Sequence, residues 1–256
     1  MTRYERLNRL LELLAEHGTL EVEAVAAELA VSVATVRRDL DHLAGQQLLT
    51  RTRGGAVANA VAYDLPLRYK SARNVSQKQR VAAVAAALVA PGAVVGLTGG
   101  TTTTELARAL ATDPALTGLT VVTNALNIAG ELTVRPHVKL VVTGGVARPQ
   151  SYELIGPIGV ASLGGLALDV TFLGVDGLDP EFGACSHHEG EAEINRLLAA
   201  RAARVVVVAD GSKLGRRAFA RICPVSAVHT LVTDDTAPAA VVDELTAAGV
   251  EVLRAS

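Results

Sequence analysis

The chain has 256 residues, enough for one large domain or two smaller ones. Half of the residues are hydrophobic, but only 3% are aromatic and there is no Trp, so we expect a core of Val, Leu and Ala. Two cysteines exclude a disulfide framework and indicate a reducing compartment. The N-terminus lacks the apolar segment of a signal peptide, and the longest apolar run, residues 81–90, is too short to span a bilayer. We therefore expect a cytoplasmic protein that does not contact a membrane.

The net charge of −2 argues against a nucleic-acid partner, but the charge is unevenly distributed. Residues 1–30 carry three Arg against six Glu, a net charge of −3. Residues 31–80 carry nine basic side chains against three acidic ones, a net charge of +6. Phosphate binding requires a local basic block and not a basic average, so this segment is suited to DNA.

The first 45 residues predict three helices. Leu7, Leu10, Leu11 and Leu14 share one face of a first helix, which the pair His17-Gly18 ends. A second, shorter helix is expected over residues 21–29, followed by a tight turn at residues 30–31. The third helix should continue to about residue 44.

The sequence VSVATVRRDL, residues 31–40, predicts that this third helix is the recognition helix of a helix-turn-helix. Val33, Val36, Leu40 and Leu43 recur at the spacing of one apolar helix face. The opposite face begins with small residues and continues with arginines, which suits close approach to a major groove. Ser32 is also expected to cap the helix. The residues of this surface that we expect at the DNA are Ser32, Ala34, Thr35, Arg37 and Arg38.

The sequence LLTRTRGGAV, residues 48–57, predicts a basic hairpin after the three helices. Residues 1–57 would then form a winged helix-turn-helix, with Arg51 and Arg53 on the DNA backbone or in a minor groove. Residues 58–75 lack periodicity and are interpreted as a linker. Four of its side chains are candidates for docking on one domain or the other: Tyr63, Leu65, Leu67 and Tyr69.

From residue 76 to residue 256, short buried strands alternate with helical runs, which predicts an α/β domain with a mainly parallel sheet covered by helices. The expected strands are residues 94–98, 119–123, 138–143, 170–176, 205–210, 229–234 and 250–253. The expected helices are residues 102–111, 127–131, 192–203 and 239–248.

A ligand site is predicted where the first of these strands turns into a helix, in the sequence LTGGTTTTEL. Glycines allow close approach to the backbone, and the free N–H groups and Thr hydroxyls at the helix start can hold an anion. The pattern is neither GxGxxG nor a Walker motif, so it favours a monophosphate over a nucleotide. The alternative is a tight turn with Thr caps and no ligand.

Polar residues follow other predicted strands as well, and in open α/β sheets the carboxyl ends of the strands border the ligand crevice. Taken singly, each of these residues could be a cap or a turn residue. Taken together, they indicate one site for a polyhydroxylated phosphate. The predicted contacts are Thr98, Gly99, Gly100, Thr101, Thr102, Thr103, Asn124, Gly144, Gly145, Asp176 and Lys213.

The run CSHHEGEAEINR, residues 185–196, is a candidate for a metal or acid–base site. Adjacent histidines are poorly placed to share one ion, and no second Cys/His cluster completes a site for His187 and His188. We expect a loop before a helix that starts at Glu191, with Glu189 as a further candidate for a ligand hydroxyl. No metal and no cofactor are predicted, and both cysteines are interpreted as structural.

In combination, these segments resemble the DeoR/GlpR family of bacterial transcriptional regulators. The resemblance rests on VSVATVRRDL with LLTRTRGGAV, and on LTGGTTT, VVTNALNIA, VVTGG, FLGVDGL and VVVVADGSKLG in the larger domain. It implies a repressor that binds operator DNA as a dimer or tetramer and responds to a phosphorylated sugar. It also implies a sensor domain similar to the ribose-phosphate isomerase and glucosamine-phosphate deaminase folds. Two positions depart from the family pattern: Arg53 stands where His is common, and Thr98 where many members carry Asp.

The sequence is compatible with two functions. The first is a ligand-controlled transcription factor. The second is a sugar-phosphate isomerase or deaminase fused to a DNA-binding module, for which Asp176 or Glu189 would be the general base. No acid–base pair at a diagnostic spacing supports the enzyme, so the sequence favours the regulator.

Overall fold

The computed structural model describes residues 1–46, 48–58, 66–71 and 74–256. The chain folds as two compact units, Met1–Arg73 and Asn74–Ser256. Each is described by itself. Within the described residues, every helix is too short or too polar to cross a lipid bilayer.

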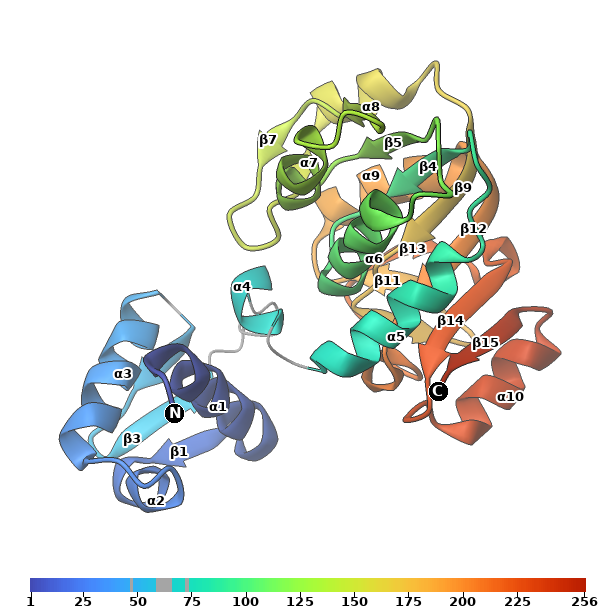
Figure 1. The fold of residues 1–256 in the computed structure, drawn as a ribbon. Coiled ribbons are helices and arrows are strands. Elements are labelled where there is room, and N and C mark those ends of the chain that lie inside the picture. Colours follow the sequence, from blue (N-terminus) through green and yellow to red (C-terminus); the bar gives the residue numbers. More distant parts are fainter. Residues whose placement is uncertain (47, 59–65, 72–73) are drawn as a thin grey trace. The chain divides into compact units, whose positions relative to one another are not determined.

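The first unit is a winged helix-turn-helix, as predicted (Figure 1). Its strands form one antiparallel sheet in the order β1-β3-β2, and the hairpin of β2 and β3 is the wing. The sequence patterns did not indicate β1, which has three residues. The elements are α1 (Arg3–His17), β1 (Thr19–Glu21), α2 (Val22–Glu28), α3 (Val33–Gly45), β2 (Leu49–Arg51), β3 (Gly55–Ala58) and α4 (Leu67–Lys70).

Local sequence explains where these helices begin and end. The Thr2 side chain accepts a hydrogen bond from Glu5 N, and the Glu5 carboxylate accepts one from Thr2 N, which makes a capping box. Gly18 ends α1 in the left-handed conformation, at φ 72°. The turn between α2 and α3 passes through Ala30, whose φ is 52°.

The core of this unit is built mainly from leucines of α1 and α3, and it includes one side chain of α4. Tyr69 is 3% exposed and packs within this core. The short helix α4 therefore lies on the first unit, within a stretch that carries no periodic signal. Of the other docking candidates, Leu67 is buried as well, whereas Tyr63 and Leu65 lie outside the described residues.

The second unit contains a parallel sheet of seven strands in the order β15-β14-β12-β9-β4-β5-β6. All seven strands were predicted from the sequence. Their bounds are β4 (Val94–Leu97), β5 (Thr120–Thr123), β6 (Lys139–Val142), β9 (Leu168–Leu173), β12 (Ala202–Val208), β14 (Thr230–Asp234) and β15 (Glu251–Ala255). The predicted fold class is thus confirmed.

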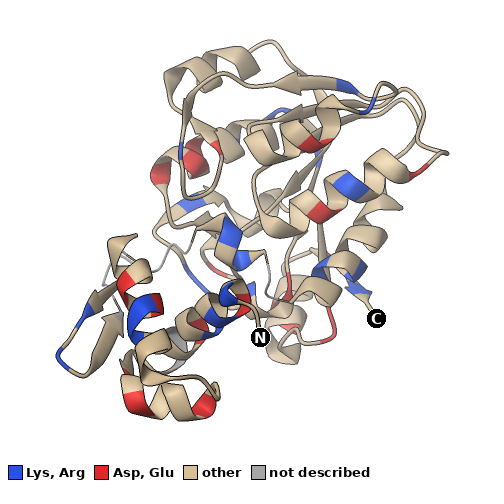
Figure 2. Ribbon diagram, turned by 60° about the vertical axis from the view of Figure 1, so that its left-hand side comes forward, with Lys and Arg blue, Asp and Glu red and all other residues tan. Residues whose placement is uncertain are grey.

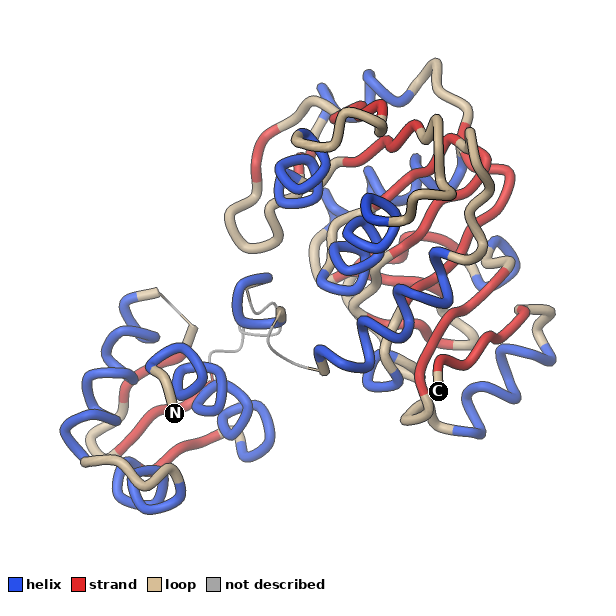
Figure 3. Tube along the Cα trace, viewed as in Figure 1, coloured by secondary structure: helices blue, strands red, loops and turns tan. Residues whose placement is uncertain are grey.

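Helices cover both faces of this sheet (Figure 3). Alternate strand residues supply the two cores: Val206 and Val208 face the core that includes α5, α6 and α7. Val205 and Val207 face the opposite core, to which α9 and α10 contribute. The helices are α5 (Val75–Ala86), α6 (Thr101–Thr112), α7 (Leu126–Thr133), α8 (Pro157–Leu163), α9 (Glu189–Ala200) and α10 (Ala239–Ala247).

Two small antiparallel sheets complete the unit, and neither was predicted. One pairs β7 (Val146–Ala147) with β8 (Leu154–Ile155). The other joins β10 (Gly177–Asp179), β11 (Gly183–Ser186) and β13 (Ala220–Cys223). Strands of two to four residues are too short to show an alternating pattern. The expected loop before α9 is wrong in part, because Cys185 and Ser186 belong to β11 and the helix begins at Glu189.

Candidate functional site

The recognition helix α3 presents the face that its sequence predicts. Val36, Leu40 and Leu43 are fully buried. The Ser32 hydroxyl accepts a hydrogen bond from Thr35 N at 3.1 Å, which confirms Ser32 as the N-cap. The predicted contact residues Ala34, Arg37 and Arg38 are exposed on the opposite face, and Thr35 is half-buried.

The arginines of this unit fall into two groups. Within the described residues, Arg37, Arg38 and Arg53 form no ion pair, so their guanidinium groups are available to a partner. Arg51 instead donates from Nε to Asp41 Oδ1 at 2.8 Å and also hydrogen-bonds the Gly55 carbonyl. It therefore ties the wing to α3. Figure 2 shows basic residues on the helices and on the hairpin of this unit.

A buried ion pair fixes α3 against α1. Asp39 is 2% exposed and accepts a hydrogen bond from Arg6 Nε; Arg3 Nε lies 3.5 Å from its other oxygen. An unpaired buried carboxylate would be costly, so this contact orients α3 as well as neutralising Asp39. Asp39 is thus engaged inside the unit and not on the surface that faces outward from α3.

In the second unit, the order in which strands are added to the parallel sheet reverses between β4 and β9. The strands β5 and β6 follow on one side of β4, whereas β9, β12, β14 and β15 follow on the other. In open α/β sheets this switch point borders the ligand crevice. The two turns that leave it are in contact, because Gly174 N donates to Thr98 Oγ1 at 2.9 Å.

The glycine-rich turn after β4 leads directly into α6. Gly100 is the N-cap residue, with φ 141°, and its carbonyl accepts hydrogen bonds from the hydroxyls of Thr103 and Thr104 at 3.0 and 2.6 Å. The N–H groups of Thr101 and Thr102 lie in the first turn, where a helix offers no acceptor of its own. Their dipoles make this end of α6 favourable for an anion.

A side chain that the sequence reasoning missed lies against this turn. Glu153 is 4% exposed, and a Cβ atom added to Gly99 would come within 2.4 Å of its carboxyl group. Asn124 Nδ2 donates to Glu153 Oε2 at 2.8 Å, and Asn195 hydrogen-bonds Glu153 as well. Gly99 is therefore required by the close approach of Glu153.

The pKa of the Glu153 carboxyl is raised from 4.5 to about 8, mainly by burial and also by the negative charges of Glu191 and Asp176. The hydrogen bonds from Asn124 and Asn195 act in the opposite direction and lower this pKa. Glu153 is thus held as a neutral acid at pH 7.

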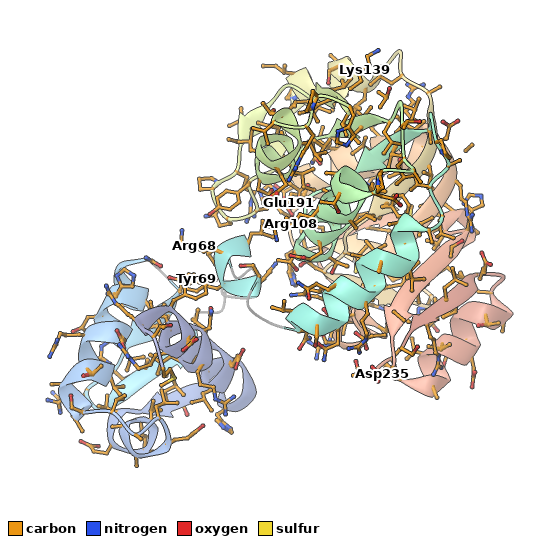
Figure 4. The ribbon with its side chains drawn as sticks, in the orientation of Figure 1. Arg68, Tyr69, Arg108, Lys139, Glu191 and Asp235 are labelled. Carbon is orange, nitrogen blue, oxygen red and sulfur yellow. The ribbon has the colours of Figure 1, made fainter. Side chains whose placement is uncertain are left out.

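Asp176 and Glu191 lie in the same group of polar side chains, in which Glu191 is buried and Asp176 is half-buried. The Ser186 hydroxyl is 3.0 Å from Glu191 Oε2 and 3.3 Å from Asp176 Oδ2. Arg148 Nη1 donates to Glu191 Oε1 at 2.8 Å, and Figure 4 labels Glu191 on α9. We call this group the strand-end cluster, which consists of Asn124, Arg148, Glu153, Asp176, Ser186, Glu191 and Asn195.

Several other predicted ligand residues lie apart from this cluster or have a packing role. A Cβ atom on Gly144 would meet Ile158 at 2.5 Å, and one on Gly145 would meet the Ile155 carbonyl at 2.7 Å. Glu189 is exposed at the first position of α9, two residues before Glu191. Lys213 is half-buried in the turn Gly211–Lys213 that follows β12, two strands away from β4.

The two histidines serve the local structure of this region. His188 caps α9 by accepting a hydrogen bond from Gly190 N at its Nδ1, and His187 N donates to Asp176 Oδ2 at 3.0 Å. Across the described part of the chain, no group of three or more His, Cys, Asp or Glu side chains could hold a metal ion. Cys185 and Cys223 are buried and unbridged.

Sequence reasoning missed Arg148, Glu153, Ser186 and Asn195, and assigned Glu191 only to the helix end. These residues come from the β7–β8 hairpin, from β11 and from α9, so no single short motif contains them all. Among the missed roles, only that of Glu191 could have been anticipated, because the run EGEAEINR places it near the start of a predicted helix.

The chain matches two domain families. Residues 6–61 match the family described as the DeoR-like helix-turn-helix domain, and residues 73–235 match the DeoR C-terminal sensor domain. The HTH-type transcriptional regulator GlpR of Haloferax volcanii is 36% identical over 97% of this chain and 96% of its own. The glycerol-3-phosphate regulon repressor of Escherichia coli K12 is 30% identical over 96% of each chain. Ribose 5-phosphate isomerase A of Methanocaldococcus jannaschii matches 55% of each chain with a TM-score of 0.42 and 21% identity.

Proposed function

This chain belongs to the DeoR family of transcriptional regulators, and from that premise we propose that it represses a carbohydrate-catabolism operon under the control of a phosphorylated sugar. The observation that carries the proposal is the pairing, in one chain, of two unlike sites. One is an exposed arginine face on α3; the other is a strand-end cluster beside a helix N-terminus. The name of the Escherichia coli relative, a glycerol-3-phosphate regulon repressor, supports a phosphate ester as the signal.

On the DNA side, Arg37 and Arg38 would reach the major groove, and Arg53 would reach the backbone from the wing. Arg51 is paired with Asp41 in the structure, so that pair would limit its contact with the backbone. Ser32, Ala34 and Thr35 lie at the start of α3 and would allow its close approach to base edges. Operators read by such helices are commonly two-fold symmetric, so a dimer or tetramer acting in the cytoplasm fits this role.

On the effector side, the phosphate would lie at the start of α6, against the N–H groups and hydroxyls of residues 99–103. The remaining carbons of the sugar would extend to Asn124 and Asp176. Gly144, Gly145, Glu189 and Lys213 remain candidates with weaker support, because the two glycines have packing roles, Glu189 is exposed and Lys213 lies in the turn after β12. Binding there would shift operator affinity by a coupling free energy of about 1–3 kcal/mol.

The DNA-binding proposal is tested in a gel-shift titration with DNA from upstream of the gene that encodes the chain. We expect Arg38→Ala to weaken binding by at least about tenfold, since one good base contact contributes about 1–3 kcal/mol. Arg201→Ala, a matched loss of an exposed arginine on the sensor unit, is the control. Equal affinity of the two variants would remove Arg38 from the interface.

The effector proposal is tested by the thermal unfolding of the full chain with phosphorylated sugars. A ligand at 100 times its dissociation constant stabilises the native state by about 2.7 kcal/mol. A panel of sugar phosphates without any stabilisation would contradict the sensor role.

One observation favours the second candidate function, a sugar-phosphate isomerase. Glu153, Asp176 and Glu191 are three acidic groups at a topological switch point, and the pKa of one of them is near neutrality. A fold alone does not imply an activity, so this candidate depends on turnover. Conversion of an aldose phosphate to its ketose by the purified full chain, abolished in Glu191→Gln, would establish the enzyme.

A further inference from the structure

The strand-end cluster is suited to bind the part of the effector that lies beyond its phosphate. We propose that Glu153 and Asn124, flanked by Asp176 and Glu191, bind a hydroxyl of the effector, so that the site selects phosphate esters with a polyol tail and rejects those with a carboxylate tail. This inference rests on the proposed effector role of the same site.

The first support is the position of Glu153. Its carboxyl group occupies the space that a side chain on Gly99 would need, and Gly99 directly precedes Gly100, the N-cap residue of α6. A phosphate held by the first turn of α6 would therefore place its ester carbons close to this carboxyl group.

The second support is an unused acceptor. Asn124 is fully buried, and its Nδ2 donates to Glu153 and to Asn195 at 2.8 and 3.4 Å. Its Oδ1 has no hydrogen-bond partner among the described residues. A buried amide oxygen without a donor is costly, and a ligand hydroxyl would satisfy it.

The third support is the charge that surrounds Glu153. The end of β9 contributes Asp176, and α9 contributes Glu191 and the neutral Asn195. The end of β5 contributes the neutral Asn124. The guanidinium of Arg148 binds Glu191 on one side, and His187 lies next to Asp176 through its backbone N–H.

These groups distinguish a hydroxyl from a carboxylate. A hydroxyl can donate to Asn124 Oδ1 and accept from the neutral acid of Glu153. A carboxylate cannot donate, and its charge would be buried beside Asp176 and Glu191. The site therefore matches a group that both donates and accepts and carries no charge.

The test uses two matched pairs of ligands that differ only in CH₂OH against COO⁻. They are glycerol 3-phosphate with 3-phosphoglycerate, and sorbitol 6-phosphate with 6-phosphogluconate. Calorimetric titration of the full chain at pH 7 should show, for at least one pair, binding of the polyol ester about tenfold or more tighter than that of the acid. Equal or tighter binding of the acid would overturn the preference while leaving the effector site in place.

Two neutral variants assign the preference to Glu153. Glu153→Gln keeps a donor and should bind the polyol ester within about threefold of the wild type. Glu153→Leu has a similar volume but no donor, and should lose about tenfold or more in polyol-ester affinity while its affinity for inorganic phosphate is unchanged. Equal affinities of the Leu and Gln variants for the polyol ester would remove Glu153 from the site. If the wild type binds neither inorganic phosphate nor any ester, the effector site itself fails, and this inference fails with it.

Discussion

The hydroxyl of Tyr69 donates a hydrogen bond to Oε1 of Gln46 at 2.6 Å. Gln46 is the C-cap residue of α3, and Arg68 Nη2 donates to the same oxygen at 3.0 Å. Figure 4 labels Arg68 and Tyr69 on α4. The helix α4 is thus fastened to the end of the recognition helix, and the sensor unit begins at Asn74, three residues after Ser71.

Replacing Tyr69 by Phe removes this hydrogen bond and keeps the ring in the core. We expect the free energy of unfolding of the first unit to fall by about 1 kcal/mol, the usual net contribution of one hydrogen bond. Urea denaturation of the full chain followed by circular dichroism measures the change. Tyr152→Phe, which removes a hydroxyl from a half-buried tyrosine of the second unit, is the control. If Tyr69→Phe is as stable as the wild type, the contact has no net energetic role.

Replacing Asp41 by Asn should strengthen DNA binding. Asp41 is exposed on the arginine face of α3 and neutralises Arg51. Loss of its charge frees the guanidinium and removes repulsion from phosphates. We expect about a fivefold gain in affinity, or about 1 kcal/mol, the energy of two unit charges 4 Å apart in water.

Gel-shift titrations of Asp41→Asn at two salt concentrations measure this gain, which should shrink at the higher concentration. Glu244→Gln removes an exposed charge from α10 and should leave the affinity unchanged. Weaker binding by Asp41→Asn would mean that its ion pair with Arg51 is needed to place the wing.

Replacing Thr98 by Val should loosen the contact between the turns after β4 and β9. Thr98 Oγ1 accepts the hydrogen bond from Gly174 N, and Val has nearly the same shape but no acceptor. An N–H group left unpaired in this partly buried site costs about 1–3 kcal/mol. Thermal unfolding of the second unit detects the loss. Thr112→Val, on the exposed end of α6, should change stability by less than about 0.5 kcal/mol.

Glu153 should make the stability of the second unit dependent on pH. Its pKa is near 4.5 in the unfolded chain and about 8 in the folded one, so the folded state holds one more proton between these pH values. The free energy of unfolding should therefore fall by about 1.4 kcal/mol for each pH unit as the pH rises from 4.5 to 8. The contribution of protonated Glu153 to stability is therefore complete below pH 4.5, and it is lost as the pH rises through 8.

The difference between the wild type and Glu153→Gln isolates this titration, because the variant retains every other ionisable group. Urea denaturation at pH 5, 6.5 and 8 should show the two proteins diverging, with the wild type losing stability relative to Gln as the pH rises. Parallel pH profiles would show that the folded protein does not perturb the pKa of Glu153.

Local signals explain why the elements that carry the fold were predictable. The face formed by Val36, Leu40 and Leu43, the cap at Ser32 and the glycines after β4 each depend on residues a few positions apart. Helix and strand periods express such short-range constraints directly. The helix α4 was not predicted, because four residues are too few to show a helical period. Its residue Tyr69 is held in place by a core that other segments of the chain build.

The amino-acid sequence by itself therefore determined the class of this protein, which is a recognition helix in a basic segment joined to a seven-stranded parallel sheet. Tertiary structure decided the chemistry of the sensor site. Asn124, Glu153, Asp176 and Glu191 come from four separate segments, and only folding brings them together. The neutral state of Glu153 likewise results from burial and neighbouring charge, which no property of its local sequence contains.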